Sequence, residues 1–471
     1  LYIRGRDMTR DLHFTVQSGG GEELNTYRIS EQLNVTNGTT LTVDPGVIVK
    51  FYDANSGINV YNGVLDAVGT AADKIVFTSQ KDDARGGDFN ADGYASAPAN
   101  GDWRGLYLLN APDGQSEIRH AVIAYGGTNT GGNIYSNGTD LTVADTELSN
   151  SSSSGLFNYY SSLTLENLEV YGNAGSGLNL QSSGTHTVTG GRLYANLGHG
   201  VYTNNGVGLR INGAEIFGNL ARGIRANGNQ AIDATGNWWG AADGPGGDFP
   251  GSGDEAVNES GGSLDVSGHL LSGSDFGYFN AGPNSSEGTL PAPAVTQGTA
   301  SDQFGSTDQL QLLYDFEQVI LDYAGMPLPA DKQFDLFVTY YNGDNTAGIG
   351  GNIQRLEDGD GSQIHGSLAI PGSSATQFRY LLPAGAHDDG SLQLNFLREN
   401  GYRAVVSQVW LVERAVSGDT DAPVSSITAP AGGAHLNGGT AQISGSSADA
   451  GSGLAAVEIG IDAGTGACLL Y

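Results

Sequence analysis

The chain contains 471 residues, of which 20 are Lys or Arg and 51 are Asp or Glu, so its formal net charge at pH 7 is −31. A surface this acidic repels nucleic acid and anionic membranes and attracts cations, which excludes proteins that bind nucleic acid. Hydrophobic residues make up 38% of the sequence, which is enough to fill folded cores and excludes a wholly disordered chain. The length predicts two or three domains.

Cysteine content and hydropathy indicate where the protein works. Cys468 is the only cysteine, so no intrachain disulfide can form, and a disulfide-free secreted chain is more typical of bacteria than of animals. No run of about 18 apolar residues occurs, so the sequence predicts no membrane span. The chain opens at Leu1 without the apolar core of a signal peptide. We expect a mature protein or a fragment, located outside the cell or on a bacterial cell surface.

Residues 88–93, with the sequence DFNADG, form the clearest chemical motif and match the start of the calcium-binding loop D-x-[DN]-x-[DN]-G. Alternate side chains of such a loop direct oxygen atoms at one hard cation, and the glycine permits a sharp turn. The glutamate of the later loop position is replaced by Ala99, and three nearby carboxylates are candidates for its role: Asp102, Asp82 and Asp83. We predict a Ca²⁺ ion held by Asp88, Asn90, Asp92 and Asp102. The alternative is an exposed acidic loop without metal.

Three consecutive segments, 163–185, 186–208 and 209–231, repeat with a period of 23 residues. A column of asparagine recurs at this interval, followed by a column of glycine: Asn173, Asn196 and Asn219; Gly177, Gly200 and Gly223. Two aliphatic columns recur as well: Val170, Leu193 and Ile216; Leu165, Val188 and Ile211. Segment 141–162 follows the same pattern with one residue fewer. A fixed period of this length is typical of proteins built from stacked repeats.

The apolar residues of each repeat alternate over short runs bounded by Gly and Asn, which is the periodicity of strands and not of helices. One repeat is too short to bury its apolar face alone. The repeats must therefore stack as coils about 4.8 Å apart, with each strand bonded to the strands above and below it. Asparagine tolerates turn geometry and satisfies backbone groups with its side-chain amide. The asparagine column is predicted to form a ladder at one corner of the coils.

These repeats resemble those of right-handed parallel β-helix proteins, the architecture of the pectate lyases, over roughly residues 25–270. Residues 41–51 (LTVDPGVIVKF) and 63–79 resemble the opening coils of bacterial surface members. Residues 236–245 (GNWWGAADGP) resemble their terminal coil, in which Trp238 and Trp239 are expected to close the open end of the core. The resemblance implies an all-β fold but no single activity, because β-helices include lyases, hydrolases, epimerases and adhesins.

Stacking turns residues one period apart into neighbours on the surface. An aromatic column consists of Tyr171, Tyr194 and Phe217. Such a column either packs at a corner of the fold or stacks against sugar rings, and we favour packing over ligand contact. His186 aligns with Leu163 and Leu209, which predicts a partly buried structural histidine.

A cluster of basic and phenolic groups is the candidate catalytic site. The period places His199 beside Arg222, and Tyr202 beside Arg225. Lyases and epimerases that act on uronates need a cation to neutralise the carboxylate and a base, such as Tyr or His, to remove the adjacent proton. The four residues supply both, yet columns of polar residues also arise from repetition alone. We therefore favour a surface without catalysis and keep catalysis as the alternative.

Residues 284–300, rich in Pro, Ser and Gly, are predicted to be a linker that follows a β-helix domain over 1–283. Short alternating strands then recur, which predicts a jelly-roll-like β-sandwich over 301–416; they lie at 334–344, 363–370, 376–383, 392–400 and 404–413. Residues 417–471 resemble the first strands of a bacterial Ig-like domain. Because such a domain needs about 100 residues, this one is expected to be truncated.

Together these features favour a secreted or cell-surface bacterial protein that acts in adhesion or carbohydrate binding and is stabilised by calcium. Its expected partner is a polysaccharide or a cell-surface glycan, and not nucleic acid. The β-helix would supply a rigid surface, and the sandwiches would be accessory modules. The alternative function is that of a polysaccharide lyase or epimerase acting on uronate-containing polymers.

Overall fold

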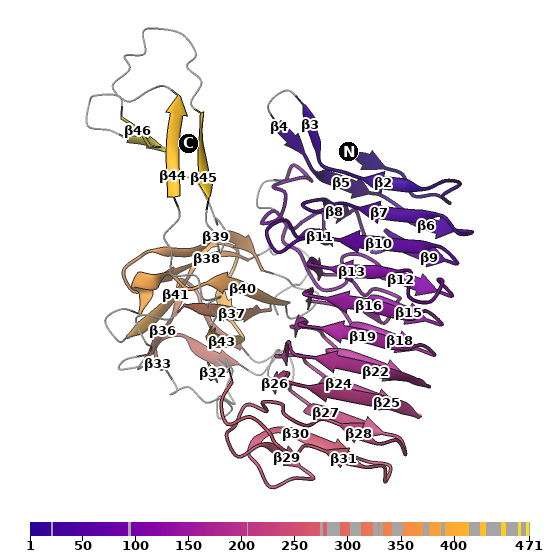
Figure 1. Ribbon diagram of the computed structural model, residues 1–471. Coiled ribbons are helices and arrows are strands. Elements are labelled where there is room, and N and C mark those ends of the chain that lie inside the picture. The colour runs from indigo at the N-terminus through magenta and orange to yellow at the C-terminus, as the bar shows by residue number, and fades with distance from the viewer. Residues whose placement is uncertain are drawn as a thin grey trace. The chain divides into compact units, whose positions relative to one another are not determined.

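A computed structural model of the chain describes residues 1–19, 22–92, 96–204, 206–273, 277–279, 293–301, 312–323, 328, 333–341, 352–370, 376–387 and 391–413, together with four short strands beyond residue 423. Residues 1–413 form one compact unit and residues 414–471 a second. Within the described ranges the regular secondary structure consists of strands and one short 3₁₀ turn, Ala384–Ala386. The fold is therefore all-β, as predicted (Figure 1). None of these residues belongs to a helix of the length and apolar character needed to cross a membrane.

The first part of the chain winds into coils whose strands form three parallel sheets, here named sheets A, B and C (Figure 1). Sheet A contains β1 (Tyr2–Ile3), β5 (Thr26–Ile29), β8 (Ile48–Phe51), β11 (Ile75–Ser79), β14 (Ala121–Ala124), β17 (Glu147–Ser149), β20 (Glu169–Tyr171), β23 (Arg192–Tyr194) and β26 (Glu215–Phe217). Sheet B contains β6 (Gln32–Thr36), β9 (Gly57–Tyr61), β12 (Leu106–Leu109), β15 (Gly132–Asn137), β18 (Ser154–Tyr159), β21 (Leu178–Gln181), β24 (His199–Asn204), β27 (Arg222–Asn227), β30 (Gly253–Asn258) and β29 (Pro245–Gly247). Sheet C contains β2 (Leu12–Phe14), β7 (Thr40–Val43), β10 (Val64–Val68), β13 (Glu117–Arg119), β16 (Leu141–Ala144), β19 (Leu163–Glu166), β22 (Gly184–Thr189), β25 (Val207–Asn212), β28 (Ile232–Asp233) and β31 (Leu264–Asp265). A short hairpin, β3 (Gln17–Gly19) and β4 (Glu22–Leu24), is inserted before β5.

The repeat period sets the register of these strands. The aliphatic columns become direct neighbours within a sheet: Leu165, Val188 and Ile211 in sheet C; Val170, Leu193 and Ile216 in sheet A. All six side chains are buried, because alternate residues of a strand point into the coil while the others point outward. Stacked coils thereby bury one continuous core, and the predicted repeat architecture is confirmed.

The asparagine column forms the predicted ladder at the corner between sheets A and B. Nδ2 of Asn173 donates to Oδ1 of Asn196 at 2.9 Å, and Nδ2 of Asn196 donates to Oδ1 of Asn219 at 2.9 Å. The ladder ends on Asp254, whose Oδ2 accepts from Asn219 at 2.9 Å. The glycine column leaves room for it, since a Cβ on Gly200 would lie 2.7 Å from a carbonyl oxygen of the next coil.

His186 occupies a core position of sheet C between Leu163 and Leu209, in the predicted register, and it is buried completely rather than partly. Burial lowers its pKa from 6.5 to about 4. Between these pH values the unfolded chain binds a proton that the folded chain does not, so stability is complete above about pH 6.5 and falls as the pH drops toward 4.

We predict that His186→Leu raises the melting temperature in acid and flattens its decline between pH 6.5 and about 4. Leucine fits because it fills the same position in the two neighbouring coils. Thermal denaturation at stepped pH measures the effect. A variant whose melting temperature falls as steeply as that of the wild type would show that His186 is not the titrating group.

The second part of the described chain forms the antiparallel sheets of a β-sandwich region. One sheet contains β32 (Gly277–Phe279), β43 (Gln408–Glu413), β37 (Phe334–Tyr340) and β40 (Thr376–Leu381). A second contains β33 (Ala294–Gln297), β36 (Gln318–Tyr323), β41 (Leu392–Asn400), β38 (Ile353–Asp358) and β39 (Gln363–Ala369). A third contains β34 (Thr299–Ser301), β35 (Leu312–Asp315) and β42 (Ala404–Val406). These sheets enclose a core of their own, which includes Leu336, Val338, Leu394 and Leu411.

Strand pairing differs from the predicted boundaries in two places. β32 lies within the range predicted for the β-helix, yet it pairs with β43 of the sandwich. β33 lies within the predicted linker, 284–300, and pairs with β36. The sandwich sheets therefore include one strand from the predicted β-helix range and one from the predicted linker.

The two tryptophans predicted to close the core lie in two different hydrophobic clusters. Trp239 is fully buried in the core of the β-helix, as expected. Trp238 belongs to a different cluster, outside that core.

In the second unit, β44 (Val424–Ala429) pairs with β45 (Ser444–Ala448), and β46 (Gly460–Asp462) pairs with β47 (Cys468–Leu470), all antiparallel. The other residues of the predicted Ig-like segment lie outside the described residues.

Candidate functional site

The predicted aromatic column of sheet A is covered by the sandwich. Tyr171, Tyr194 and Phe217 stack along the coils with ring centroids 5.4 and 5.0 Å apart, and each is at most 2% exposed. Phe337 of β37 meets the two tyrosines edge-on at 5.1 and 5.4 Å, and Trp410 of β43 joins the same cluster. In this structure the column packs against the sandwich, and no ring offers a free face to a sugar.

A buried ionic network lies beside these rings. Glu147 of β17 is 9% exposed and accepts a hydrogen bond from the Tyr171 hydroxyl at 2.6 Å. Two guanidinium groups approach it, Arg85 Nη2 at 3.5 Å from the loop after β11 and Arg379 Nη1 at 4.0 Å from β40. Burial alone would raise the pKa of Glu147, but these two cations hold it below its ordinary value. The charged carboxylate thus links the loop, the β-helix and the sandwich.

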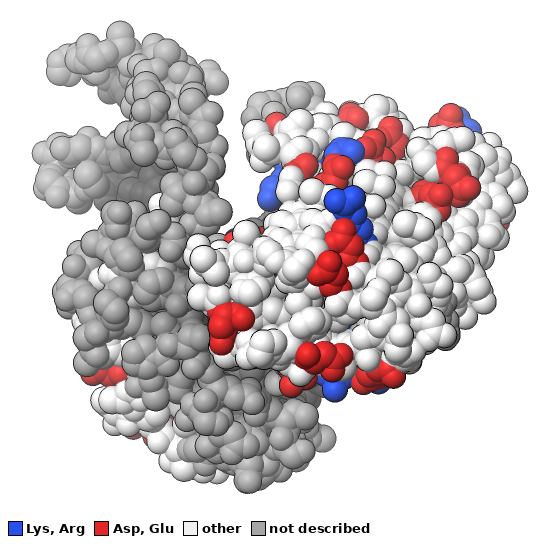
Figure 2. Space-filling view, turned by 60° about the horizontal axis from the view of Figure 1, so that its bottom comes forward, with Lys and Arg blue, Asp and Glu red and all other residues white. Residues whose placement is uncertain are grey.

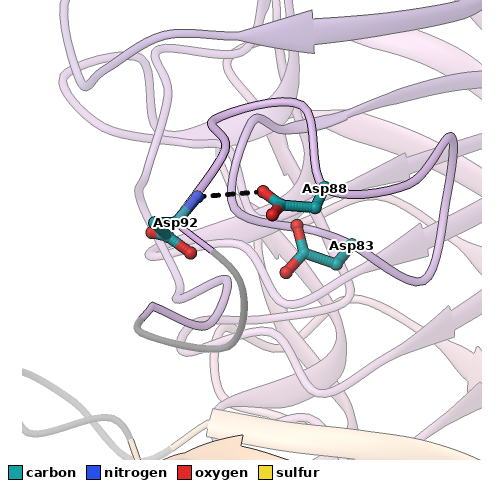
Figure 3. A group of neighbouring side chains, drawn as sticks. All are labelled: Asp83, Asp88 and Asp92. Atoms are coloured by element: carbon teal, nitrogen blue, oxygen red, sulfur yellow. Dashed lines mark hydrogen bonds between the residues drawn. The ribbon is translucent and has the colours of Figure 1, made fainter.

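Three carboxylates of the loop after β11 come together, those of Asp83, Asp88 and Asp92 (Figure 3). One oxygen atom from each lies within 4.8 Å of the others. Burial, and next the charge of Asp88, raise the pKa of Asp83 to about 6. A divalent cation would relieve this repulsion, and carboxylate oxygens are the ligands that Ca²⁺ prefers.

Asn90, the third oxygen-bearing residue of the motif, lies in the same loop. Its Nδ2 donates to Asp92 Oδ2 at 2.7 Å, whereas its Oδ1 is buried without a hydrogen-bond partner. Asp83 Oδ1 is buried and without a hydrogen-bond partner as well. Gly93 of the motif lies outside the described residues.

Asp102, predicted as the fourth ligand, does not join the cluster. It accepts hydrogen bonds from Lys81 Nζ at 2.7 Å and from Ser79 Oγ at 2.8 Å, so its oxygens are engaged elsewhere. Asp83, one of the two alternatives that the sequence offered, takes its place.

Lys50 of β8 fixes the same loop, although the sequence analysis did not single it out. Its Nζ donates to the carbonyl oxygens of Asp82 at 2.9 Å and of Gly87 at 2.6 Å, and the side chain is fully buried. Burial lowers the pKa of Lys50, while the carboxylates of Asp82 and Asp83 oppose this shift. A lysine inside an apolar strand was the only sign of this role.

The candidate catalytic residues lie together on sheet B in the predicted register, with His199 beside Arg222 and Tyr202 beside Arg225. Two glutamates already neutralise the two arginines, because Arg222 binds Glu255 at 3.1 Å and Glu259 at 2.8 Å, and Arg225 binds Glu259 at 2.8 Å. The hydrogen bonds from Arg225 and Arg222 lower the pKa of Glu259 to about 2. A uronate carboxylate would have to compete with this glutamate. Figure 2 shows the same pattern over the face that it draws, where basic side chains adjoin acidic ones.

The outer face of sheet B carries a double column of uncharged side chains that the sequence analysis did not assemble. One column contains Asn59, Tyr107, Tyr135, Phe157, Asn179 and Tyr202. The column beside it contains Tyr61, Leu109, Asn137, Tyr159, Gln181 and Asn204. The rings of Tyr107, Tyr135 and Phe157 are parallel, with centroids 4.7 and 5.3 Å apart. In a chain with a net charge of −31, the part of this face from β9 to β24 is uncharged, and the first column then continues to Arg225 of β27.

Comparison with known proteins agrees with this architecture. Residues 100–238 match the model of the right-handed β-helix region, and residues 21–134 match that of the pectate-lyase-like β-helix domain. No curated protein matches the chain significantly.

Several solved structures match parts of the chain at low identity. The enzymatically active domain of tailspike protein 2 of bacteriophage CBA120 is 12% identical over 83% of this chain and 72% of that chain, with a TM-score of 0.28. The periplasmic alginate epimerase AlgG is 12% identical over 52% and 76%, with a TM-score of 0.23. The Dettilon tailspike protein is 9% identical over 81% and 87%, with a TM-score of 0.24. From its three parallel sheets and the two matching family models, the N-terminal part of the chain is a right-handed parallel β-helix.

Proposed function

We propose that the protein is an extracellular carbohydrate-binding protein of the bacterial surface type, which holds a polysaccharide or a cell-surface glycan on the outer face of sheet B. The observation that carries the proposal is the uncharged double column of this sheet. A glycan presents apolar C–H patches between hydroxyl groups. Phenol rings and side-chain amides offer apolar area together with donors and acceptors, which is the complementary combination. Binding of this kind would serve adhesion.

The double column is held in place before any ligand arrives. Asn137 Nδ2 donates to the Tyr135 hydroxyl at 3.3 Å, and Gln181 Nε2 donates to Asn179 Oδ1 at 2.9 Å. These side chains are half-buried between their neighbours on a sheet. Because little side-chain freedom remains to be lost, binding costs less entropy than it would on a flexible loop.

Tyr135→Ala is predicted to weaken glycan binding by about tenfold or more, which corresponds to about 1.4 kcal/mol, because the change opens a gap in the middle of the stacked rings. Binding is first screened on a polysaccharide array and then measured by calorimetry. Tyr52→Ala is the matched control, since Tyr52 is an exposed tyrosine (46%) outside the double column. If the two variants bind the glycan with equal affinity, the binding site does not lie on sheet B.

The lyase form of the alternative function is examined in the same samples, because epimerisation leaves no product that absorbs. The register that brings His199 and Tyr202 beside two arginines favours it, and elimination at a uronate creates a conjugated double bond that absorbs ultraviolet light. We expect no rise in absorbance with alginate, pectate or a glycosaminoglycan. A rise that Arg222→Ala or Tyr202→Phe abolishes would contradict pure binding and establish the alternative.

We also propose that calcium stabilises the β-helix through the loop after β11. The cluster of Asp83, Asp88 and Asp92 supports this proposal, together with the raised pKa of Asp83 and the oxygen of Asn90 that has no hydrogen-bond partner. The ion would draw together a loop that Lys50 already fixes to β8. Its charge would offset the mutual repulsion of the carboxylates.

Added Ca²⁺ is predicted to raise the melting temperature, because a ligand that binds only the folded state stabilises it, by about 2.7 kcal/mol at a concentration of 100 times Kd. Asp88→Ala combined with Asp92→Ala should remove the rise. Asp66→Ala combined with Asp113→Ala, which changes two aspartates of other coils, should keep it. Calorimetry that detects no calcium binding to the wild type, or binding that survives the first pair of changes, would refute the site.

A further inference from the structure

A cleft of about 830 Å³ opens between the β-helix and the sandwich. One wall is formed by residues from 81–88 and 96–98 of the loop after β11, which also carries the carboxylates of Figure 3, and the other wall is formed by β39 and β40. The floor includes Tyr125 and Tyr171, which follow or belong to strands of sheet A. The volume lies within the range of about 300–1,000 Å³ that is typical of small-molecule sites. Both parts of the first unit are needed to make this cleft.

The arginines that line the cleft are paired within the protein. Arg85 binds Asp82 at 3.0 Å in addition to Glu147. Arg379 binds Asp335 at 2.6 Å in addition to Glu147. A guanidinium has five N–H donors, more than these ion pairs use, so both arginines still offer donors to a ligand. Because their charges are compensated, the floor favours an acceptor that is itself uncharged.

The sandwich supplies an aromatic wall. The ring of His365 in β39 stacks on that of Tyr380 in β40, with centroids 4.7 Å apart. Its Nδ1 lies 2.7 Å from the carbonyl oxygen of Gly366, which can only accept, so Nδ1 carries the proton and Nε2 accepts from the Tyr340 hydroxyl at 2.8 Å. The wall is therefore a neutral aromatic surface fixed by hydrogen bonds, which suits the C–H face of a sugar.

The floor also leaves one acceptor for a ligand. Asn150 lines the cleft and is 3% exposed, and its Oδ1 has no hydrogen-bond partner. A buried carbonyl oxygen without a donor has lost its hydrogen bonds to water without replacement. A ligand hydroxyl that donates to this oxygen would replace one of them.

We propose that this cleft binds a short uncharged saccharide, the end or a branch of a glycan, so that the sandwich completes a binding site and is more than a spacer. Sugar hydroxyls donate to Asn150 and accept from Arg85 and Arg379, while the C–H face packs on His365 and Tyr380. The choice of carbohydrate as the ligand class rests on the proposed function. The location of the site does not rest on the proposed function, because the cleft lies at sheet A and the double column lies on sheet B.

The experiment blocks the cleft with a large side chain and uses the full-length protein. Ala97→Trp places a large ring on the loop wall, and Ala72→Trp, at an exposed position outside the cleft, is the matched control. The probes are uncharged disaccharides and trisaccharides on an array, followed by calorimetry with those that bind. Ala97→Trp should raise Kd by at least about tenfold. Ala72→Trp should leave Kd unchanged.

Each outcome decides the proposal. Loss of short-saccharide binding in Tyr135→Ala but not in Ala97→Trp would move the site to sheet B. No binding of any short saccharide by the wild type, or binding of cationic sugars alone, would overturn the cleft assignment. Polymer binding that Tyr135→Ala abolishes would still support the proposed function. If Ala97→Trp fails to melt cooperatively, Ala369→Trp on the opposite wall fills the same cleft.

Discussion

Val188→Asp is expected to abolish folding of the β-helix. Val188 of β22 is 1% exposed and lies in the core column between Leu165 and Ile211. Losing its burial costs about 2 kcal/mol, and an unpaired carboxylate in the core costs several more. The sum approaches the net stability of a whole domain, about 5–15 kcal/mol. Because a coil contacts only the coils next to it, no other contact bypasses the damaged one.

Circular dichroism during heating measures this effect, and the expected trace lacks the cooperative transition of the β-helix. Thr187→Asp introduces the same charge one residue earlier in the same strand, where the side chain is exposed. That variant should melt like the wild type. A normal transition in Val188→Asp would mean that the aliphatic columns are not the core.

The coils were predictable because a fixed period converts sequence directly into register. Leu165, Val188 and Ile211 align by counting alone, and so do the three asparagines of the ladder. Counting fails where the period breaks. Asp254, the last rung, lies 35 residues after Asn219, and β32 pairs with a strand more than 100 residues away. Pairings of that kind depend on tertiary packing, which no local pattern records.

The carboxylate cluster of the loop after β11 was predictable only in part, for the same reason. Alternate spacing within one turn brings Asp88 and Asp92 together, whereas the folding of the chain decides which distant carboxylate joins them. Lys81 and Ser79 engage Asp102, which leaves Asp83 to complete the cluster. In the double column of sheet B, the loop between β11 and β12 interrupts the period, so only the fold places Asn59 beside Tyr107. Phe157, Asn179 and Tyr202 follow the repeat and could have been aligned by counting.

The aromatic column of sheet A could either pack or bind sugar, and the sequence analysis favoured packing. The sequence of β37 gives a second indication that the column packs. A strand with one solvent-exposed face alternates apolar and polar residues. Residues 334–340 (FDLFVTY) lack this alternation, and all seven are buried. A strand covered on both faces shows such a continuous apolar run. One face of β37 meets the sandwich core through Leu336 and Val338, and the other meets the column through Phe337.

Phe337→Asp is therefore predicted to separate the sandwich from the β-helix without unfolding either. Phe337 is fully buried and belongs to neither of the two large cores. Removing a buried phenylalanine costs about 3–5 kcal/mol. The new carboxylate gains little from Arg379, which already binds Asp335 at 2.6 Å. Calorimetry should resolve two melting transitions where the wild type shows one for residues 1–413, the compact unit.

Two further variants decide whether the contact itself is responsible. Leu381→Asp changes an exposed leucine (47%) of β40 in the same sheet, so it should keep the single transition. Gly218→Ala acts from the β-helix side, since its Cβ would lie 2.3 Å from the Trp410 ring, and it should split the transition without adding charge. If both Phe337→Asp and Gly218→Ala melt in one step, the aromatic cluster does not hold the two parts together. Short-saccharide binding should disappear with the split, because the cleft needs a wall from each part.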